Sequence, residues 1–383
     1  LLTGRDTGHS PVRDETPPPL SADAITVAEV MRAAGYRSAF VGAWGLGGDG
    51  TTGHPLRQGF DEFFGWTDLR EAGDPFPAWL WRNTTPFRLP GNQAAPRRDF
   101  GADWIARTAT NAVRLWQDHP FLLVFNPPVP RAHRFPTTNS FEGLAAPPSA
   151  PPGGTPAEQG RAARLARLDA YVGAVLASLK AYRLDEDTVV LLTSHHGPGR
   201  LPGLRAAEAG PYGPWSTQPG PLSEGRLRVP LLARWPDHIR PGAVSHRPVT
   251  AADLLPTLAE LAGAPQPRGL TGRSFADTLR GEPGEPPPRP LYWETRQDGF
   301  RQALRLGPWK AHRKGPDQPL RLHHLGDDPT EARDVSGAHP EVVAQARELL
   351  ERLPEPWTPP PPPPPGPAAA PAPASPAGAT PPR

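Results

Sequence analysis

Helical segments alternate with short apolar segments along most of this chain, and that alternation restricts the fold more than any other feature. Residues 26–35 form the first helical segment, because Thr26 and Glu29 have the spacing of a capping box and Gly35 marks an end. Residues 36–41 then have a strand pattern. Helices that alternate with apolar strands predict an α/β fold, with a mixed, mostly parallel sheet sandwiched by helices.

The same alternation continues through the following residues. The run FLLVF at 121–125 is apolar throughout, which predicts a strand buried on both faces. Thr250 and Asp253 are spaced like a second helix cap, ahead of a helical segment that Gly263 ends. The remaining predicted helices are 103–117 and 161–182, and the remaining predicted strands are 188–193 and 229–233.

The character of the sequence changes near residue 286. Four short strand candidates and one helix follow, which predicts a small C-terminal strand-plus-helix subdomain at 286–353 after an α/β domain at 1–285. Many of the 58 prolines fall in residues 354–383, which we expect to be a disordered, polyproline-like tail. The strand candidates are 291–294, 303–306, 309–312 and 320–325, and the helix is 340–353.

Composition excludes several classes of function. The 41 basic and 39 acidic residues nearly balance, so no overall field indicates a nucleic-acid partner. The absence of cysteine excludes disulfides, thiolate metal sites and a cysteine nucleophile within these residues. No apolar run reaches the roughly 18 residues of a membrane span. The chain starts at Leu1 with an apolar pair that runs into a turn, and we expect its N-terminus to be truncated.

Ligand sites in open α/β sheets gather at the carboxyl ends of the strands. The loops at 42–48, 126–133, 194–200 and 215–228 are therefore the candidate site. The first of them lies in FVGAWGLGGDG (40–50), which contains no charged side chain before Asp49.

Seven short motifs occur in order along the chain. They are LLTGR (1–5), TVAEVMRAAGYRSAFVGAWGLG (26–47), GFDEFFGW (59–66), PFLLVFNPPVP (120–130), DEDTVVLLTSHHGP (185–198), SEGRLRVPLLARWPDHIRPG (223–242) and TAADLLPTLAELAGAP (250–265). This series resembles the type I sulfatases of the alkaline-phosphatase superfamily. The later stretches LGPWKAHR and LRLHHLGDDPTEARDV are similar to their C-terminal subdomain.

The resemblance implies a parent activity, the hydrolysis of small-molecule sulfate esters. In this family a formylglycine made from a cysteine attacks sulfur, and three Asp and one Asn hold calcium. Lysine and histidine side chains bind the sulfate oxygens and protonate the leaving group. The family also makes a periplasmic or secreted location plausible, although the residues present leave localisation and protein partners unknown.

Six positions inside the chain depart from the family pattern. In the family's Gly-Lys-Trp-His-Leu-Gly loop, the lysine position is Ala43 and the histidine position is Gly45. A further histidine position is Val129, and a further lysine position is Pro219. The Asp-Asn metal pair is replaced by His195 and His196.

These replacements remove the chemistry that the resemblance implies. Ala, Gly, Val and Pro have no side-chain donor or charge for sulfate, and imidazoles supply no negative charge for calcium. The nucleophilic cysteine would precede Leu1 and is absent. We therefore predict no catalytic, substrate-binding or metal residue, no cofactor, and an inactive chain.

Two alternatives remain open. The chain is a non-catalytic binding or interaction protein on a sulfatase fold, or it is a repurposed metal-dependent phosphate or sulfate ester hydrolase. For the second, His195, His196 and His133 are the candidate ligands, since imidazole suits zinc or copper. Adjacent residues at a strand end point in different directions, which favours one ligand from the pair. We expect His323 and His324 to be structural or exposed.

Overall fold

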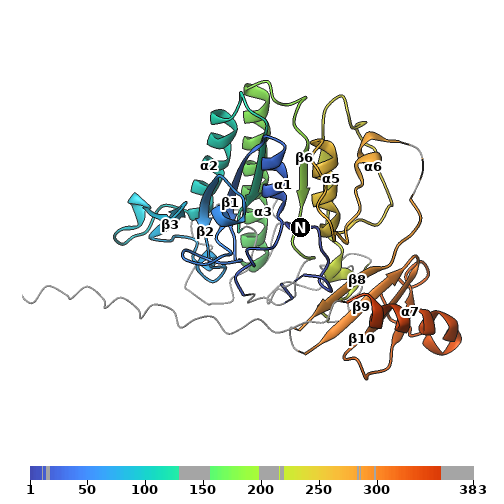
Figure 1. Cartoon of the computed structure of the whole chain (residues 1–383). Coiled ribbons are helices and arrows are strands. Elements are labelled where there is room, and N and C mark those ends of the chain that lie inside the picture. Colours follow the sequence, from blue (N-terminus) through green and yellow to red (C-terminus); the bar gives the residue numbers. More distant parts are fainter. Residues whose placement is uncertain are drawn as a thin grey trace, which may run out of the picture.

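The computed structural model describes residues 1–10, 12–13, 18–128, 156–197, 215, 220–282, 284, 286–296 and 299–354. Figure 1 shows an α/β part, with helices on either side of its strands, and a smaller C-terminal part drawn in orange and red. The predicted α/β fold with a mixed sheet and a C-terminal subdomain is confirmed. Except for Pro354, the predicted proline-rich tail lies outside the described residues.

The largest sheet has five strands in the order β4-β3-β2-β1-β5. β1 (Arg37–Ala43) lies between β2 (Glu62–Trp66) and β5 (Phe121–Asn126) and is parallel to both. β3 (Trp79–Arg82) and β4 (Thr85–Arg88) extend the sheet as antiparallel strands. The parallel part of the sheet is therefore centred on β1, the strand that leads into the FVGAWGLGGDG loop.

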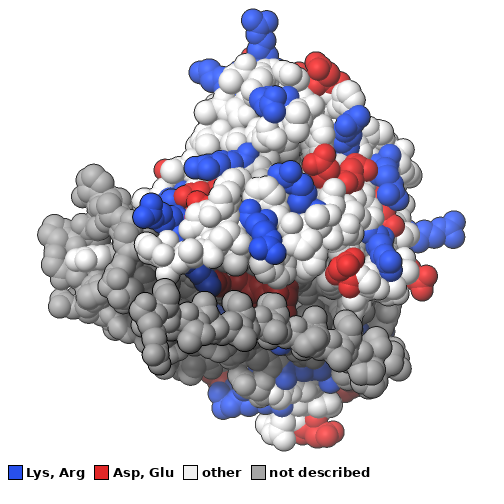
Figure 2. All heavy atoms as spheres, turned by 90° about the vertical axis from the view of Figure 1, so that its left-hand side faces the viewer, with Lys and Arg blue, Asp and Glu red and all other residues white. Residues whose placement is uncertain are grey.

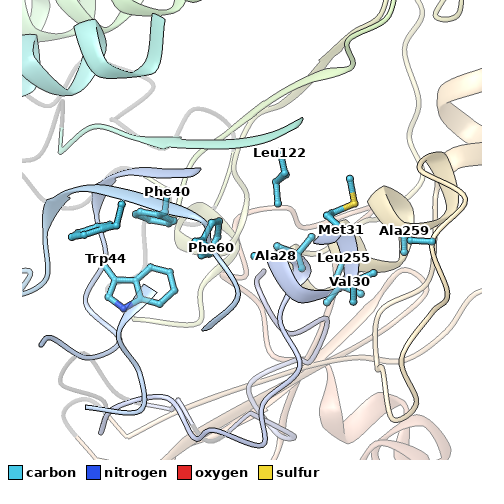
Figure 3. Close-up of a cluster of buried hydrophobic side chains, with 12 residues drawn as sticks. Ala28, Val30, Met31, Phe40, Trp44, Phe60, Leu122, Leu255 and Ala259 are labelled. Carbon is cyan, nitrogen blue, oxygen red and sulfur yellow. The ribbon is translucent and has the colours of Figure 1, made fainter. Parts of the chain in front are cut away.

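The side chains of β1 alternate between two hydrophobic cores, as a strand with helices on both faces requires. Phe40 belongs to the core that α1 (Val27–Ala33) and α5 (Leu254–Leu261) complete, and Figure 3 shows this cluster. Val41 belongs to the other core, which α2 (Gly101–Leu115) covers. The sheet is thus buried on both faces at β1.

Both predicted helix caps are present. The side-chain oxygen of Thr26 accepts a hydrogen bond from the backbone N–H of Glu29 at 3.3 Å, and a Glu29 carboxylate oxygen accepts from the N–H of Thr26 at 2.8 Å. Thr250 and Asp253 form the second capping box, at the 3₁₀ turn η4 (Ala251–Asp253) that leads into α5. These short-range signals place the starts of both helices correctly.

Residues 121–125 pack against the cores on both faces of the sheet, as predicted, but their burial is less complete than predicted. Only Leu122 of this run is fully buried, and its other residues are half-buried. Among the described residues β5 pairs with β1 alone, and a strand with one neighbour has fewer side chains to cover its faces. β6 (Val190–Thr193) and β7 (Leu231–Arg234) instead form a separate antiparallel pair.

The remaining helices of the main part lie in two places. α3 (Pro156–Ala181) packs against α2, and α6 (Ala276–Arg280) packs against α5. The short helix α4 (Glu224–Leu227) precedes β7.

The C-terminal part is an antiparallel sheet with one helix on it. Its four strands have the order β11-β10-β9-β8, and α7 (Pro340–Arg352) supplies Ala346, Leu349 and Leu350 to their common core. The predicted strands and helix are all present within a few residues. The strands are β8 (Leu291–Thr295), β9 (Arg301–Leu306), β10 (Trp309–Arg313) and β11 (Arg321–His324).

Buried polar contacts join the two parts of the chain. Arg13 Nη1 lies 2.9 Å from Glu294 Oε1 in a buried ion pair, and the backbone N–H of Glu294 donates to Thr7 Oγ1 at 2.7 Å. Lys310 Nζ in β10 lies 2.9 Å from Glu224 Oε1 of α4. The proposed boundary at residue 285 therefore separates units that share buried contacts.

The surface gives no single dominant charge on the face seen in Figure 2, where basic and acidic side chains are interspersed over its upper part. None of the described helices is both long and apolar enough to cross a bilayer. The prediction of no nucleic-acid partner stays a prediction.

Candidate functional site

The loop that follows β1 is packed against its surroundings. Trp44 is buried, its Nε1 donates to the carbonyl of Gly53 at 2.8 Å, and its ring meets Phe40 edge-on with ring centroids 4.9 Å apart (Figure 3). The backbone N–H of Gly45 donates to the carbonyl of Thr67 at 3.2 Å. These contacts hold the loop against the end of β2.

Ala43 is the residue that the sequence analysis predicts in place of the family's lysine. Its side chain is 6% exposed and lies in the apolar core with Val41, Phe64 and Trp66. Its carbonyl accepts a hydrogen bond from Asn126 Nδ2 at 2.7 Å. Ala43 is therefore held in place by β5 and surrounded by apolar groups, and its side chain carries no positive charge.

Gly45 is the residue that the sequence analysis predicts in place of the family's histidine. Its φ of +80° lies in the left-handed region, which residues with a Cβ adopt only at a cost. A Cβ built there would lie 2.5 Å from Leu69 Cγ, which is far inside van der Waals contact. Leu69 thus fills the space that a side chain at position 45 would need.

This geometry predicts that restoring the histidine destabilises the fold. We expect Gly45→His to lower the free energy of unfolding by about 1–3 kcal/mol more than Gly50→His, measured by chemical denaturation. Gly50 is a matched control, since its φ is +78° but no atom lies within 4 Å of its built Cβ. Equal losses for the two variants would show that Leu69 does not fill the position.

His195 and His196 follow β6 and are both exposed. Their ring centroids are 5.2 Å apart, and His196 Nδ1 donates to the carbonyl of Gly197 at 2.7 Å. That hydrogen bond places the proton on Nδ1 and leaves the lone pair on Nε2. His196 is therefore able to offer one nitrogen to a ligand.

The residues present do not fit the calcium that the family resemblance implies. Calcium prefers carboxylate and carbonyl oxygens, whereas positions 195 and 196 offer imidazole nitrogens. Within the described ranges, no group of three or more His, Asp or Glu side chains could hold a metal ion. We derive no catalytic step through calcium. The other predicted site residues, Val129, His133 and Pro219, lie outside the described residues.

Comparison with known proteins decides the family. The protein-family model for Sulfatase matches residues 1–264. The chain belongs to the sulfatase family. Arylsulfatase A of Homo sapiens is 30% identical over 383 aligned residues, which cover 86% of this chain and 71% of that protein.

Two further comparisons give lower sequence identities. N-acetylgalactosamine-6-sulfatase of Homo sapiens is 28% identical over 74% of this chain and 53% of its own length. The crystal structure of Ps i-CgsB superposes with a TM-score of 0.74 at 23% identity, covering 91% of this chain and 80% of that one. At this identity the structural likeness shows a shared fold alone.

One residue of this sulfatase site was missed by the sequence reasoning. Leu69 belongs to no family motif used above, yet it decides what fits at position 45. The register of the parallel strands β1 and β2 was the signal that could have identified Leu69. Ala43 pairs with Trp66, so the residues that follow the two strand ends lie side by side.

Proposed function

We propose that this sulfatase chain keeps the family scaffold without hydrolysing sulfate esters. The relatives are named as sulfatases, and sulfate ester hydrolysis is the parent activity. The principal observation is at Gly45, where Leu69 lies in the space of the histidine side chain. The loop therefore lacks the histidine and is also repacked around its absence.

The loss of positive groups supports the same proposal. Catalysis of sulfate transfer depends on donors and cations aimed at the oxygens on which negative charge develops. Removal of a single such donor costs about 10²–10³ in rate. Ala43 and Gly45 remove two at once, and no described side chain at these positions replaces them.

Positions 195 and 196 support the proposal independently. Two imidazoles cannot neutralise calcium, and a protonated imidazole repels a cation. The sequence at Val129 and Pro219 points in the same direction, since neither side chain has a donor. A chain with this constellation fits a non-catalytic binding or interaction protein.

A repurposed metal-dependent ester hydrolase has one observation in its favour, the available Nε2 of His196. It lacks a cluster of three ligands in the described part of the chain. We therefore keep it as the second candidate.

The two candidates differ in a simple assay. We expect no hydrolysis of a chromogenic aryl sulfate or aryl phosphate above a buffer blank, with calcium or with zinc. Zinc-dependent turnover that is lost in His196→Ala, with unchanged far-ultraviolet circular dichroism, would instead establish the repurposed hydrolase.

A further inference from the structure

A cavity of about 200 Å³ lies in the C-terminal part, away from the loop that follows β1. It is bounded by the segment 220–223, by strands β9 to β11, and by residues near Glu331 and Asp334. It is smaller than the roughly 300–1,000 Å³ of pockets that enclose drug-sized ligands, so its size suits a small group.

The charged side chains around this cavity are mainly cationic. Four basic residues line it, and no ion pair joins any of them to a carboxylate in the described ranges. Of the two acidic residues, Glu331 is already 2.8 Å from Lys310 Nζ, and Asp334 accepts backbone N–H groups of Leu322 and Ser336. The basic residues are Arg301, Arg313, Lys314 and Arg321.

Two of the arginines differ in their hydrogen bonding. Arg313 is buried, and Gln302 Oε1 at 2.7 Å and the carbonyl of Pro316 at 2.8 Å hold its guanidinium in place. Arg301 Nε is buried and has no hydrogen-bond partner among the described residues. An unsatisfied buried donor is costly, and an anion in the cavity would give it an acceptor.

A histidine pair forms another part of the lining. His323 Nδ1 donates to the carbonyl of Arg333 at 2.9 Å, so His323 Nε2 accepts the proton of His312 Nε2 across 3.1 Å. Burial lowers the pKa of His312 to about 4, repulsion by Lys310 and Arg321 acts in the same direction, and attraction by Asp334 opposes it. A bound anion would offset the repulsion that Lys310 and Arg321 exert at His312.

We propose that this cavity binds a tetrahedral oxyanion, a sulfate or phosphate group, free or as the charged end of a monoester. Arginine forks match the geometry of such oxygens, and Lys314 and Arg321 are exposed enough to close over the group. The proposal does not depend on whether the chain is catalytically active, since it uses none of the loops at 43–45 or 195–196.

The test is a titration of the whole chain with sodium sulfate and, separately, sodium phosphate, with sodium chloride at equal ionic strength as the reference. The imidazole resonances of His312 and His323 are followed by nuclear magnetic resonance. We expect saturable shifts of these resonances and a raised pKa of His312 when sulfate or phosphate binds. The anion with the lower dissociation constant is the preferred ligand. Identical resonances in all three salts would overturn the proposal.

Variants locate the binding. We expect Arg321→Ala to weaken oxyanion binding about tenfold, because one charge-assisted contact is lost. Arg352→Ala, at an exposed arginine of α7 outside the cavity, should leave the affinity unchanged. If Arg321→Ala does not fold, Lys314→Ala takes its place. Equal affinities of the cavity variant and Arg352→Ala would contradict the assignment.

Discussion

Replacing Lys310 with alanine is expected to lower the free energy of unfolding by about 3–5 kcal/mol. The lysine side chain is 0% exposed, and its Nζ lies 2.9 Å from Glu224 Oε1 and 2.8 Å from Glu331 Oε1. Although burial raises the pKa of Glu224, Lys310 and Arg228 lower it below its usual range, so the carboxylate is charged. Without the lysine, the buried carboxylates of Glu224 and Glu331 lose the positive charge that balances them.

Chemical denaturation measures this loss, and an exposed lysine provides the control. Lys180→Ala, at the end of α3, should change the free energy of unfolding by less than about 0.5 kcal/mol. The combined change K310M/E224Q/E331Q should recover much of the loss, because it removes the uncompensated charges as well. A loss below 1 kcal/mol for Lys310→Ala would show that the triad does not join α4 to the C-terminal sheet.

His312 is expected to make the chain acid-sensitive in chloride buffer. Its pKa is about 4 in the folded state, mainly because of burial, and 6.5 is the ordinary value. Between these two values the unfolded chain binds more protons, so a fall in pH favours unfolding. The contribution is complete above pH 6.5, and about 3 kcal/mol is lost as the pH falls to 4.

The variant His312→Gln should remove this part of the pH dependence. Its amide N–H can still donate to His323 Nε2, but it does not titrate. His246→Gln, at an exposed histidine, is the matched control and should retain the wild-type profile. Measured unfolding free energies between pH 4 and 7 distinguish the two, and parallel profiles for wild type and His312→Gln would refute the assignment.

Local signals in the sequence predict much of the fold. The caps at Thr26 and Thr250 and the apolar runs at β1, β5, β6 and β7 require only neighbouring residues, and all are found. The β3–β4 hairpin was missed, since its turn at Asn83 depends on a positive φ of 56° in a non-glycine residue. The burial of β5 was overestimated, because its position at the edge of the sheet, among the described residues, depends on the whole sheet.

In the candidate sites, too, local sequence predicts some features while others depend on tertiary structure. The motif around Ala43 and Gly45 predicts from sequence alone that a lysine and a histidine side chain are missing. That Leu69 occupies the space, or that His312 and His323 meet, depends on strand register and so on tertiary structure. β10 and β11 pair Lys310 with His323 and His312 with Arg321, which brings these side chains together across the ladder.

The measurement that tests the central claim most directly is aryl sulfate hydrolysis by the purified chain. Human arylsulfatase A, assayed in the same buffer with calcium, is the positive control, and a chelator arm reports metal dependence. For this chain we predict a rate equal to the buffer blank, both with calcium and with the chelator. Calcium-dependent turnover that the chelator abolishes would contradict the account, because it would mean that the loop packed around Gly45 and Leu69 still supports the parent chemistry.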